Sequence, residues 1–211
     1  MRRLSRDMMA LTLASLGAAA AAQAQRGTVE GTVTVPSARI TGVVVYLVPD
    51  SAPAAPAVEP ADAGMDQRDL RFLPRVVVVT PGSTVVFSNT DQVRHNVFHP
   101  MQHNDGFDLG TWPPGESRRY TFKAQGAYVI LCNVHPEMVG YVVVVATPYR
   151  AVTDDEGRFR IEGVAPGSYR LRTWHRWLAT REERITVLAD GVVRLTLALK
   201  YGDAGEPSAG R

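Results

Sequence analysis

The sequence predicts an all-β protein that contains two β-sandwiches. Short apolar runs rich in β-branched and aromatic residues recur along the chain, such as those at 76–79 and 140–145. Residues that favour turns separate these runs, which is the pattern of strands joined by short loops. One Ala/Pro-rich stretch, at 51–66, interrupts this pattern and has no apolar period. Without its first 24 residues the chain is still long enough for two small domains.

The elements follow in order along the chain. Apolar runs at 28–35 and 40–48 predict a strand pair, and 51–66 is predicted to be a linker. Residues 67–147 are predicted to form one sandwich. Beyond it, turns at 154–157 and 166–167 separate further strands, which are predicted at 151–153, 158–161, 168–174, 184–188 and 192–199. From 201 to 211 Gly, Pro and Ser dominate, and we expect a disordered tail.

The N-terminus has the three parts of a secretory signal peptide. They are a basic region with Arg2, Arg3 and Arg6, an apolar run at 8–22, and a small-x-small cleavage site at 22–24. The apolar run is shorter than the roughly 18 residues that a spanning helix needs. We therefore expect bacterial export to the periplasm, with residues 1–24 removed and no membrane span in the mature chain.

The charges are balanced and exclude some partners. The chain has 23 Lys and Arg against 21 Asp and Glu, and it lacks a polybasic run. Binding to nucleic acid depends on an excess of positive charge, so we expect no nucleic-acid partner. The chain has a single cysteine, Cys132, so it has no intramolecular disulfide and its stability must come from sheet cores.

The segment from Cys132 to Met138 concentrates metal-binding side chains. It joins two predicted strands and contains a thiol, the imidazole of His135 and a thioether, while His95 follows another apolar run upstream. Two His, one Cys and a weak Met form a donor set that suits copper and one-electron exchange. Taken singly, each residue has a simpler explanation: a buried Cys is usually a small apolar residue, and a Met is usually core. Because they occur together, we expect one copper ion per chain.

A second group of possible copper ligands lies just downstream of His95. His99, Met101 and His103 alternate along a stretch that is rich in turn residues. They are interpreted either as a solvated loop or as a weak exterior copper site, and we expect the loop. The aromatic stretch 174–177 is likewise either core or a surface that stacks on sugars, and we expect core.

The stretch 72–145 resembles the cupredoxin family. The resemblance rests on 72–79, Pro81-Gly82, Asn89-Thr90-Asp91, His95-Asn96-Val97, 107–110, 113–117, Gly126-Ala127-Tyr128 and the ligand loop. The loop is most similar to that of amicyanins. Residues 107–110, 113–117 and the segment after the loop resemble proteins called methylamine utilisation proteins. The resemblance implies a Greek-key sandwich with a type 1 copper site, in which His95, Cys132 and His135 are equatorial ligands and Met138 is axial. It also implies that Asn96 ties the two ligand-bearing segments together.

The C-terminal stretch resembles half of another family. Residues 153–161 and 163–171 are similar to the second half of a carboxypeptidase regulatory-like, transthyretin-type sandwich. The first half of that pattern, a Gly-x-Val followed by an apolar strand, is found instead at 31–33 and 43–47. The resemblance implies that 27–50 and 148–200 form one sandwich, into which the copper-binding domain at 67–147 is inserted.

Three classes of function are compatible with these features. The first is a blue copper protein that transfers electrons between periplasmic redox proteins, with His135 as the electron port. The second is a copper carrier or storage protein, which His99, Met101 and His103 would favour. The third is a copper enzyme, which needs further His-rich sites that five His residues do not readily supply. We expect electron transfer and no enzymatic activity.

Overall fold

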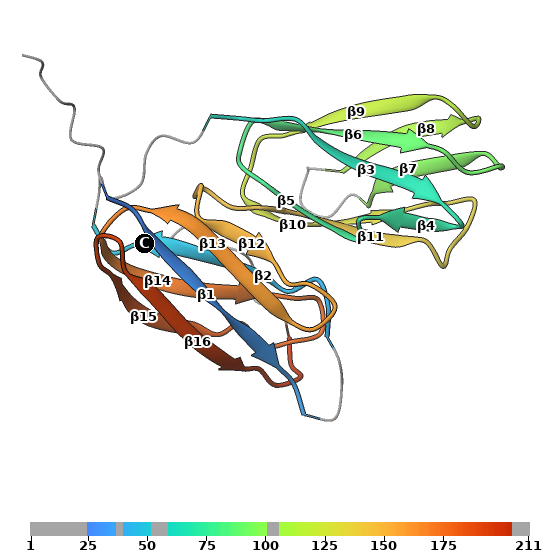
Figure 1. Ribbon diagram of the computed structural model, residues 1–211. Coiled ribbons are helices and arrows are strands. Elements are labelled where there is room, and N and C mark those ends of the chain that lie inside the picture. The colour runs from blue at the N-terminus through green and yellow to red at the C-terminus, as the bar shows by residue number, and fades with distance from the viewer. Residues whose placement is uncertain (1–24, 37–39, 52–58, 101–105, 204–211) are drawn as a thin grey trace, which may run out of the picture.

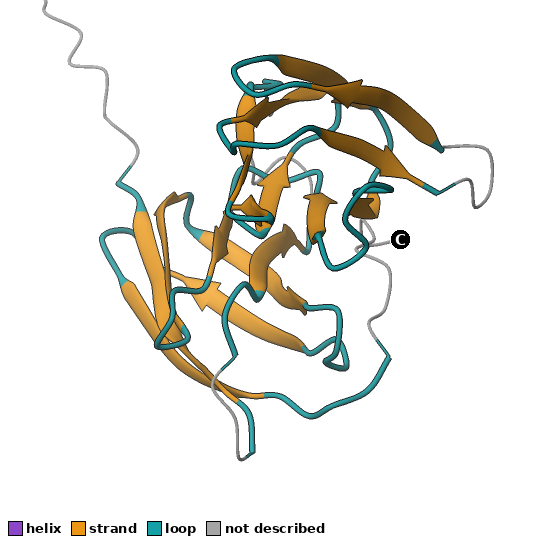
Figure 2. Cartoon of the chain, turned by 90° about the vertical axis from the view of Figure 1, so that its right-hand side faces the viewer, coloured by secondary structure: helices purple, strands orange, loops and turns teal. Residues whose placement is uncertain are grey.

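The computed structural model describes residues 25–36, 40–51, 59–100 and 106–203. These residues form sixteen β-strands in four sheets and no helix, as the sequence predicts (Figure 1 and Figure 2). In this part of the chain there is accordingly no helix with the length and apolar character needed to cross a membrane.

Two sheets from the middle of the chain form the first sandwich. One sheet contains, in order across it, β5 (Val76–Val79), β11 (Val139–Val144), β10 (Gly126–Leu131), β7 (His95–His99) and β8 (Phe107–Trp112). The other contains β4 (Arg71–Leu73), β3 (Ala63–Arg68), β6 (Ser83–Asn89) and β9 (Ser117–Phe122). Large side chains such as Phe87, Trp112 and Phe122 are fully buried between them. These rings supply much of the apolar area that stabilises this sandwich.

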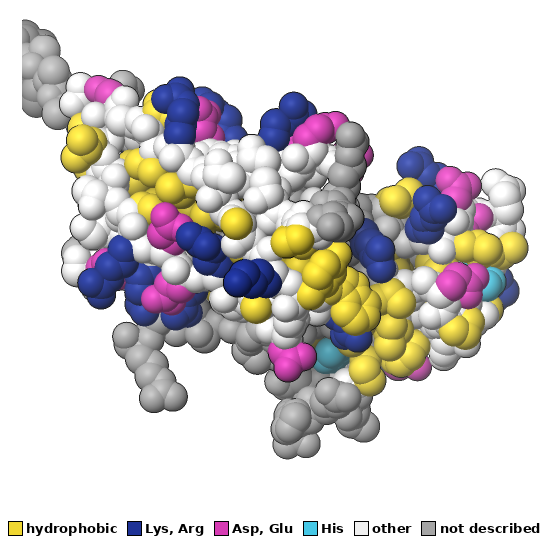
Figure 3. Space-filling model, turned by 90° about the horizontal axis from the view of Figure 1, so that it is seen from below, with side chains coloured by type: hydrophobic (Ala, Val, Ile, Leu, Met, Phe, Trp, Pro, Cys, Tyr) yellow, Lys and Arg dark blue, Asp and Glu magenta, His cyan; other side chains and the backbone are white. Residues whose placement is uncertain are grey.

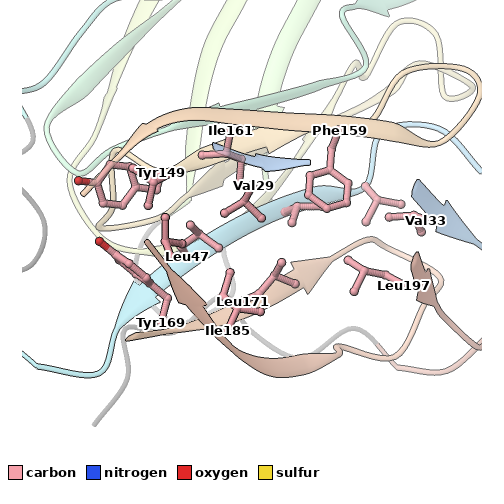
Figure 4. Close-up of a cluster of buried hydrophobic side chains, with 14 of the residues drawn as sticks. Val29, Val33, Leu47, Tyr149, Phe159, Ile161, Tyr169, Leu171, Ile185 and Leu197 are labelled. Atoms are coloured by element: carbon pink, nitrogen blue, oxygen red, sulfur yellow. The ribbon is translucent and has the colours of Figure 1, made fainter. Parts of the chain in front are cut away.

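Two further sheets combine both ends of the chain into the second sandwich. One contains β13 (Arg158–Val164), β1 (Gly27–Thr34) and β16 (Val192–Ala198); the other contains β12 (Arg150–Val152), β2 (Val44–Pro49), β14 (Gly167–Trp174) and β15 (Glu182–Val187). Their shared core includes Val29, Leu47, Tyr169 and Leu171 (Figure 4). At Gly31 a Cβ would lie 2.3 Å from the Leu195 carbonyl oxygen, so β1 and β16 approach too closely there for any other residue.

A third core joins the two sandwiches to each other. Val44, Tyr46 and Trp174 from the second sandwich pack with Tyr141 and Val143 from the first. The rings of Tyr141 and Trp174 meet edge to face, with centroids 5.5 Å apart. The four sheets are therefore stacked in layers, with one core between each layer and the next.

This stacking explains the continuous valine runs in the sequence. In β11, Val142 and Val144 point into the first core, while Tyr141 and Val143 point into the third. β2 is likewise buried on both faces, and its side chains alternate between two cores. Strands of the outer sheets, such as β9 and β13, instead alternate between exposed and more buried residues. A strand with both faces covered has no polar face, and its sequence is apolar throughout.

The expected strand pair near the N-terminus is wrong. β1 and β2 form, but they lie in different sheets: β1 pairs with β13 and β16, whereas β2 pairs with β12 and β14. The physical reason lies in their side chains. β1 has one partly exposed face and fits an outer sheet, while β2 is apolar on both faces and fits an inner sheet.

The expected linker ends earlier than predicted. β3 begins at Ala63, inside the 51–66 stretch, and pairs in parallel with β6. Met65 and Gln67 of this strand are buried, but the short run has too few apolar residues to be recognised as a strand.

The two tryptophans of the stretch 174–177 differ in burial: Trp174 is core as expected, whereas Trp177 is 56% exposed. Tyr201 forms a bridge with Leu178, while residues 204–211 and the predicted signal at 1–24 lie outside the described residues.

Candidate metal centre

The strands place the predicted ligands at one end of the first sandwich. His95 is the first residue of β7, and Cys132 directly follows β10. These two strands are neighbours in the sheet, with Leu131 paired to Phe98. The loop after β10 returns to β11 at Val139, so it carries His135 back over the same sheet edge. One strand start and one loop therefore bring three donor side chains together.

The three donor atoms form a triangle. Nδ1 of His95 and Nδ1 of His135 each lie 4.0 Å from Cys132 Sγ, and the two nitrogens are 3.0 Å apart. A point equidistant from all three atoms is about 2.2 Å from each, within the range of about 2.0–2.3 Å for bonds from nitrogen or sulfur to a small divalent metal. His95 and Cys132 are buried and His135 is half-buried. The arrangement fits a metal ion held by two imidazoles and one thiolate.

A carboxylate fixes the orientation of the first imidazole. His95 Nε2 lies 3.0 Å from Asp91 Oδ2. An ionised carboxylate only accepts, so Nε2 carries the proton and Nδ1 keeps a free lone pair directed at the centre of the triangle. The Asp91 side chain is only 12% exposed.

The Asp91 carboxylate is in turn held by the backbone. The Leu70 N–H donates to Asp91 Oδ2 at 2.9 Å. This bond is the main cause that lowers the pKa of Asp91 to about 2, with further help from the Gln92 N–H and from His95. Leu70 has a φ of 56°, in the left-handed region that a leucine rarely adopts, within the turn that joins β3 to β4. Strained backbone of this kind is often found at functional sites.

Asn96 connects the two segments that carry the ligands, as the sequence predicts. Its N–H points at Cys132 Sγ at 3.4 Å, and its side-chain oxygen accepts from the Asn133 N–H at 3.3 Å. Its Nδ2 donates to Asp108 Oδ1 at 2.7 Å and to the Gly110 carbonyl at 3.0 Å. Asn96 is buried, and so is its contact with Cys132 Sγ. The N–H directed at sulfur helps to fix the position of the Cys132 side chain.

Met138 is buried in the same core as Cys132. Its backbone N–H donates to the His135 carbonyl at 3.0 Å, which closes the ligand loop into a tight turn. The role of its sulfur as a fourth ligand stays a prediction.

His99 is engaged away from this triangle. Its Nδ1 bonds the Val129 carbonyl at 2.8 Å, and its ring lies edge to face with Tyr128. Met101 and His103 lie outside the described residues. The exterior copper site therefore stays a prediction.

Sequence reasoning missed two residues that support the site. Asp91 precedes His95 by four residues, but this spacing indicates a contact only where the turn between them is known. Gln67 is fully buried in β3 and donates from Nε2 to the Asn96 carbonyl at 3.1 Å. Its strand begins inside the predicted linker at 51–66, and no motif in the sequence pointed to Gln67.

Family models match two parts of the chain. Residues 60–145 match copper binding proteins of the plastocyanin/azurin family, and residues 137–200 match the carboxypeptidase regulatory-like domain. No curated protein shows a significant match.

Several solved structures have similar regions. A purple cupredoxin from Nitrosopumilus maritimus has 24% identity and a TM-score of 0.36, over 39% of this chain and 99% of that one. Amicyanin from Paracoccus versutus has 23% identity and a TM-score of 0.37, over 50% and 99%. The copper-containing nitrite reductase from Thermus scotoductus has 25% identity and a TM-score of 0.38, over 53% of this chain and 28% of that one.

Proposed function

We propose that this chain is a blue copper protein that transfers single electrons between redox proteins, since residues 60–145 match copper binding proteins of the plastocyanin/azurin family. The observation that carries the proposal is the buried triangle of His95 Nδ1, His135 Nδ1 and Cys132 Sγ, with edges of 3.0, 4.0 and 4.0 Å. Met138 would hold the copper ion as a weak fourth ligand. A copper ion bound there would supply a one-electron couple.

The surroundings of the ligands favour rapid electron exchange. Asp91 fixes the ring of His95, and Asn96 fixes the segments on both sides of Cys132. These bonds would hold the donor atoms in place in both oxidation states of a bound copper ion. Neither oxidation state would obtain its preferred geometry, so a change of charge requires little movement.

His135 is the proposed point of electron entry and exit. It is the half-buried member of the triangle, and the other two ligands are buried. Large apolar side chains are exposed on nearby segments: Leu70 (40%), Val93 (42%) and Val134 (45%). The Leu70 N–H donates to Asp91, which holds His95, and Val134 precedes His135 in the loop. Exposed apolar groups around a redox centre suit brief docking of a protein partner.

We propose that this exchange takes place in the periplasm, because of the predicted signal at 1–24. We also propose that 27–50 and 148–200 form one structural domain with the copper-binding domain inserted into it. The pairing of β1 and β2 with strands from the C-terminal segment supports this division. The sandwich carries no chemistry that we can assign to electron transfer, and its proposed task is to hold the copper-binding domain.

A redox titration of the chain without residues 1–24 tests the proposal. The protein is loaded with one equivalent of Cu(II), and its EPR and visible spectra are followed through cycles of ascorbate and ferricyanide. We expect intense colour that bleaches and returns fully, and rapid electron self-exchange by NMR line broadening. A pale complex from which a chelator of moderate strength removes the copper within minutes would instead support the copper carrier.

A further inference from the structure

The surface has two hollows along the line where the two sandwiches meet. One has a volume of about 430 Å³ and the other about 700 Å³. Tyr141, Trp174, Arg176 and Trp177 line both hollows, so the hollows adjoin each other, and we call the two together the seam groove. In Figure 3 hydrophobic side chains gather where the two parts of the molecule meet, with basic side chains and a His beside them. None of the proposed copper ligands lines either hollow.

The groove has an aromatic surface that is open to solvent. Trp174 is anchored in the third core, but Trp177 is 56% exposed. The Arg176 guanidinium lies over the Trp177 ring, 4.8 Å from the centroid. Tyr201, 59% exposed, lines the larger hollow. An exposed tryptophan ring beside a hollow is a suitable platform for a flat or ring-shaped ligand.

Arginines that have no acidic partner in the described part of the chain lie beside this platform. Arg75 and Arg176 line the smaller hollow, and neither forms an ion pair among the described residues. Ten other arginines in this part of the chain do, including Arg170 and Arg172 of β14. A guanidinium is matched in shape to a carboxylate, which it can bind through two hydrogen bonds.

Uncharged and acidic groups complete the smaller hollow. His175 Nδ1 accepts a hydrogen bond from the Trp177 N–H at 3.3 Å, which leaves Nε2 as the donor in the neutral ring. Burial and the nearby Arg75 lower the pKa of His175, which favours that neutral form. Thr41 adds a hydroxyl and Asp155 adds a carboxylate. Such a mixture of donors and acceptors suits hydroxyl groups, which need both.

The charge balance restricts the ligand. Asp155 in one hollow and Asp203 in the other would repel a densely charged polyanion. A neutral sugar would leave both arginines without a partner, and an apolar ligand would also leave the hydroxyl and imidazole groups unpaired. A ring with hydroxyl groups and a single carboxylate satisfies all of these groups.

We propose that the seam groove binds an acidic oligosaccharide, with the carboxylate of one uronic-acid unit on Arg75 and Arg176 and a neighbouring sugar ring stacked on Trp177. The two adjoining hollows provide room for more than one ring. The groove would attach the protein to an acidic glycan while the copper end stays free. This binding is independent of the proposed electron transfer.

Calorimetric titration with two matched trisaccharides tests the proposal on the chain without residues 1–24. The acidic probe is aldotriouronic acid, one glucuronic acid on two xylose units, and the neutral probe is xylotriose. We expect saturable binding of the acidic probe and at least tenfold weaker binding of the neutral one. Arg75→Gln and Arg176→Gln should each weaken binding of the acidic probe about tenfold or more, because each removes a charged donor to the carboxylate. Trp177→Ala should weaken it to a similar extent, because it removes the ring on which the sugar stacks. Arg184→Gln, at an exposed arginine outside the groove, should not change it.

Three results would overturn the proposal. Equal affinities for xylotriose and the acidic probe would show that the arginines do not recognise a carboxylate. Displacement of the acidic probe by benzoate at equal concentration would show that the occupant is an aromatic acid and not a sugar. If the acidic probe shows no saturable binding at millimolar concentration, the site is ruled out. The copper spectrum of each variant is recorded beside the titration, so a failure here leaves the proposed electron transfer separately tested.

Discussion

Asp91 and His95 form a hydrogen bond of 3.0 Å on the side of the imidazole that faces away from Cys132. The carboxylate is fixed by the Leu70 and Gln92 N–H groups, so it holds the ring as well as its tautomer. We predict that Asp91→Ala lowers copper affinity about 10- to 100-fold, as is usual when the partner of a metal-binding histidine is removed. Competition with a chelator of known affinity measures this. Asp62→Ala, which removes an exposed carboxylate paired with Arg119, is the matched control. Equal affinity in the two variants would contradict the role of Asp91.

Met138 provides the second prediction. Met138→Gln should keep copper bound but lower the reduction potential, because a harder oxygen ligand stabilises Cu(II) relative to Cu(I). Cyclic voltammetry of the copper-loaded variant measures the change. Met65→Gln is not a suitable control because Met65 is also buried, so Met138→Leu is used to separate loss of the sulfur from loss of packing. If the potential is unchanged in both variants, Met138 is a core residue and not a ligand.

The two tryptophans of the 174–177 stretch provide a matched pair for stability. Trp174 is 4% exposed and packs on Tyr141 across the core between the sandwiches, whereas Trp177 is 56% exposed. Trp174→Ala should destabilise the protein by about 3–5 kcal/mol, because it leaves a large cavity in a packed core. Trp177→Ala should change the free energy of unfolding by about 0.5 kcal/mol or less. Urea unfolding of both variants without copper measures the difference. Similar stabilities would mean that the core between the sandwiches contributes little.

His175 is expected to titrate at an unusually low pH. Burial, and then the charge of Arg75, lower its pKa below the ordinary value of 6.5. With a folded pKa below the unfolded one, the unfolded chain binds the proton more tightly. The contribution of this group to stability is therefore present above about pH 6.5 and is lost as the pH falls through that value towards the folded pKa.

NMR titration of the His175 ring measures this pKa directly. Arg75→Gln should raise it towards 6.5 without restoring it fully, since burial is the larger cause. Arg184→Gln, at a position outside the hollow that His175 lines, should leave it unchanged. A pKa at or above 6.5 in the unsubstituted chain would contradict this account of its surroundings.

The sequence indicates which residues could form the metal site more clearly than it indicates which strands lie side by side. Three of the predicted ligands, Cys132, His135 and Met138, are close together in the sequence, and apolar periodicity predicts a strand on each side of their loop. Asp91 and Leu70 were not predicted, because their contact depends on two turns that the topology brings together. The separate sheets of β1 and β2 were also not predicted. Period and composition reveal that a strand is buried, but not which strand lies beside it.

Resemblance extended the prediction where local patterns ended. Alternation alone does not connect 27–50 to the C-terminal strands, which lie more than a hundred residues away in sequence. The divided pattern of a known sandwich suggested that connection, and β1 does pair with β13 and β16. The short strand at 63–68 has neither a clear period nor a known motif, and its first four residues were predicted as linker. Its partner β6 is recognisable from the sequence, but the parallel register that places Met65 opposite Phe87 is not.

The visible spectrum of Cys132→Ser tests the central claim most directly. A serine hydroxyl is a harder and rarely ionised ligand, so the variant should fold normally but lose the intense colour that a thiolate gives to bound Cu(II). The free energy of unfolding without copper shows whether the fold is retained. Loss of the intense band in a folded variant, while the unsubstituted chain keeps it, is the result that we predict. An intense band of unchanged position and strength in Cys132→Ser would contradict a copper centre built on His95, Cys132 and His135.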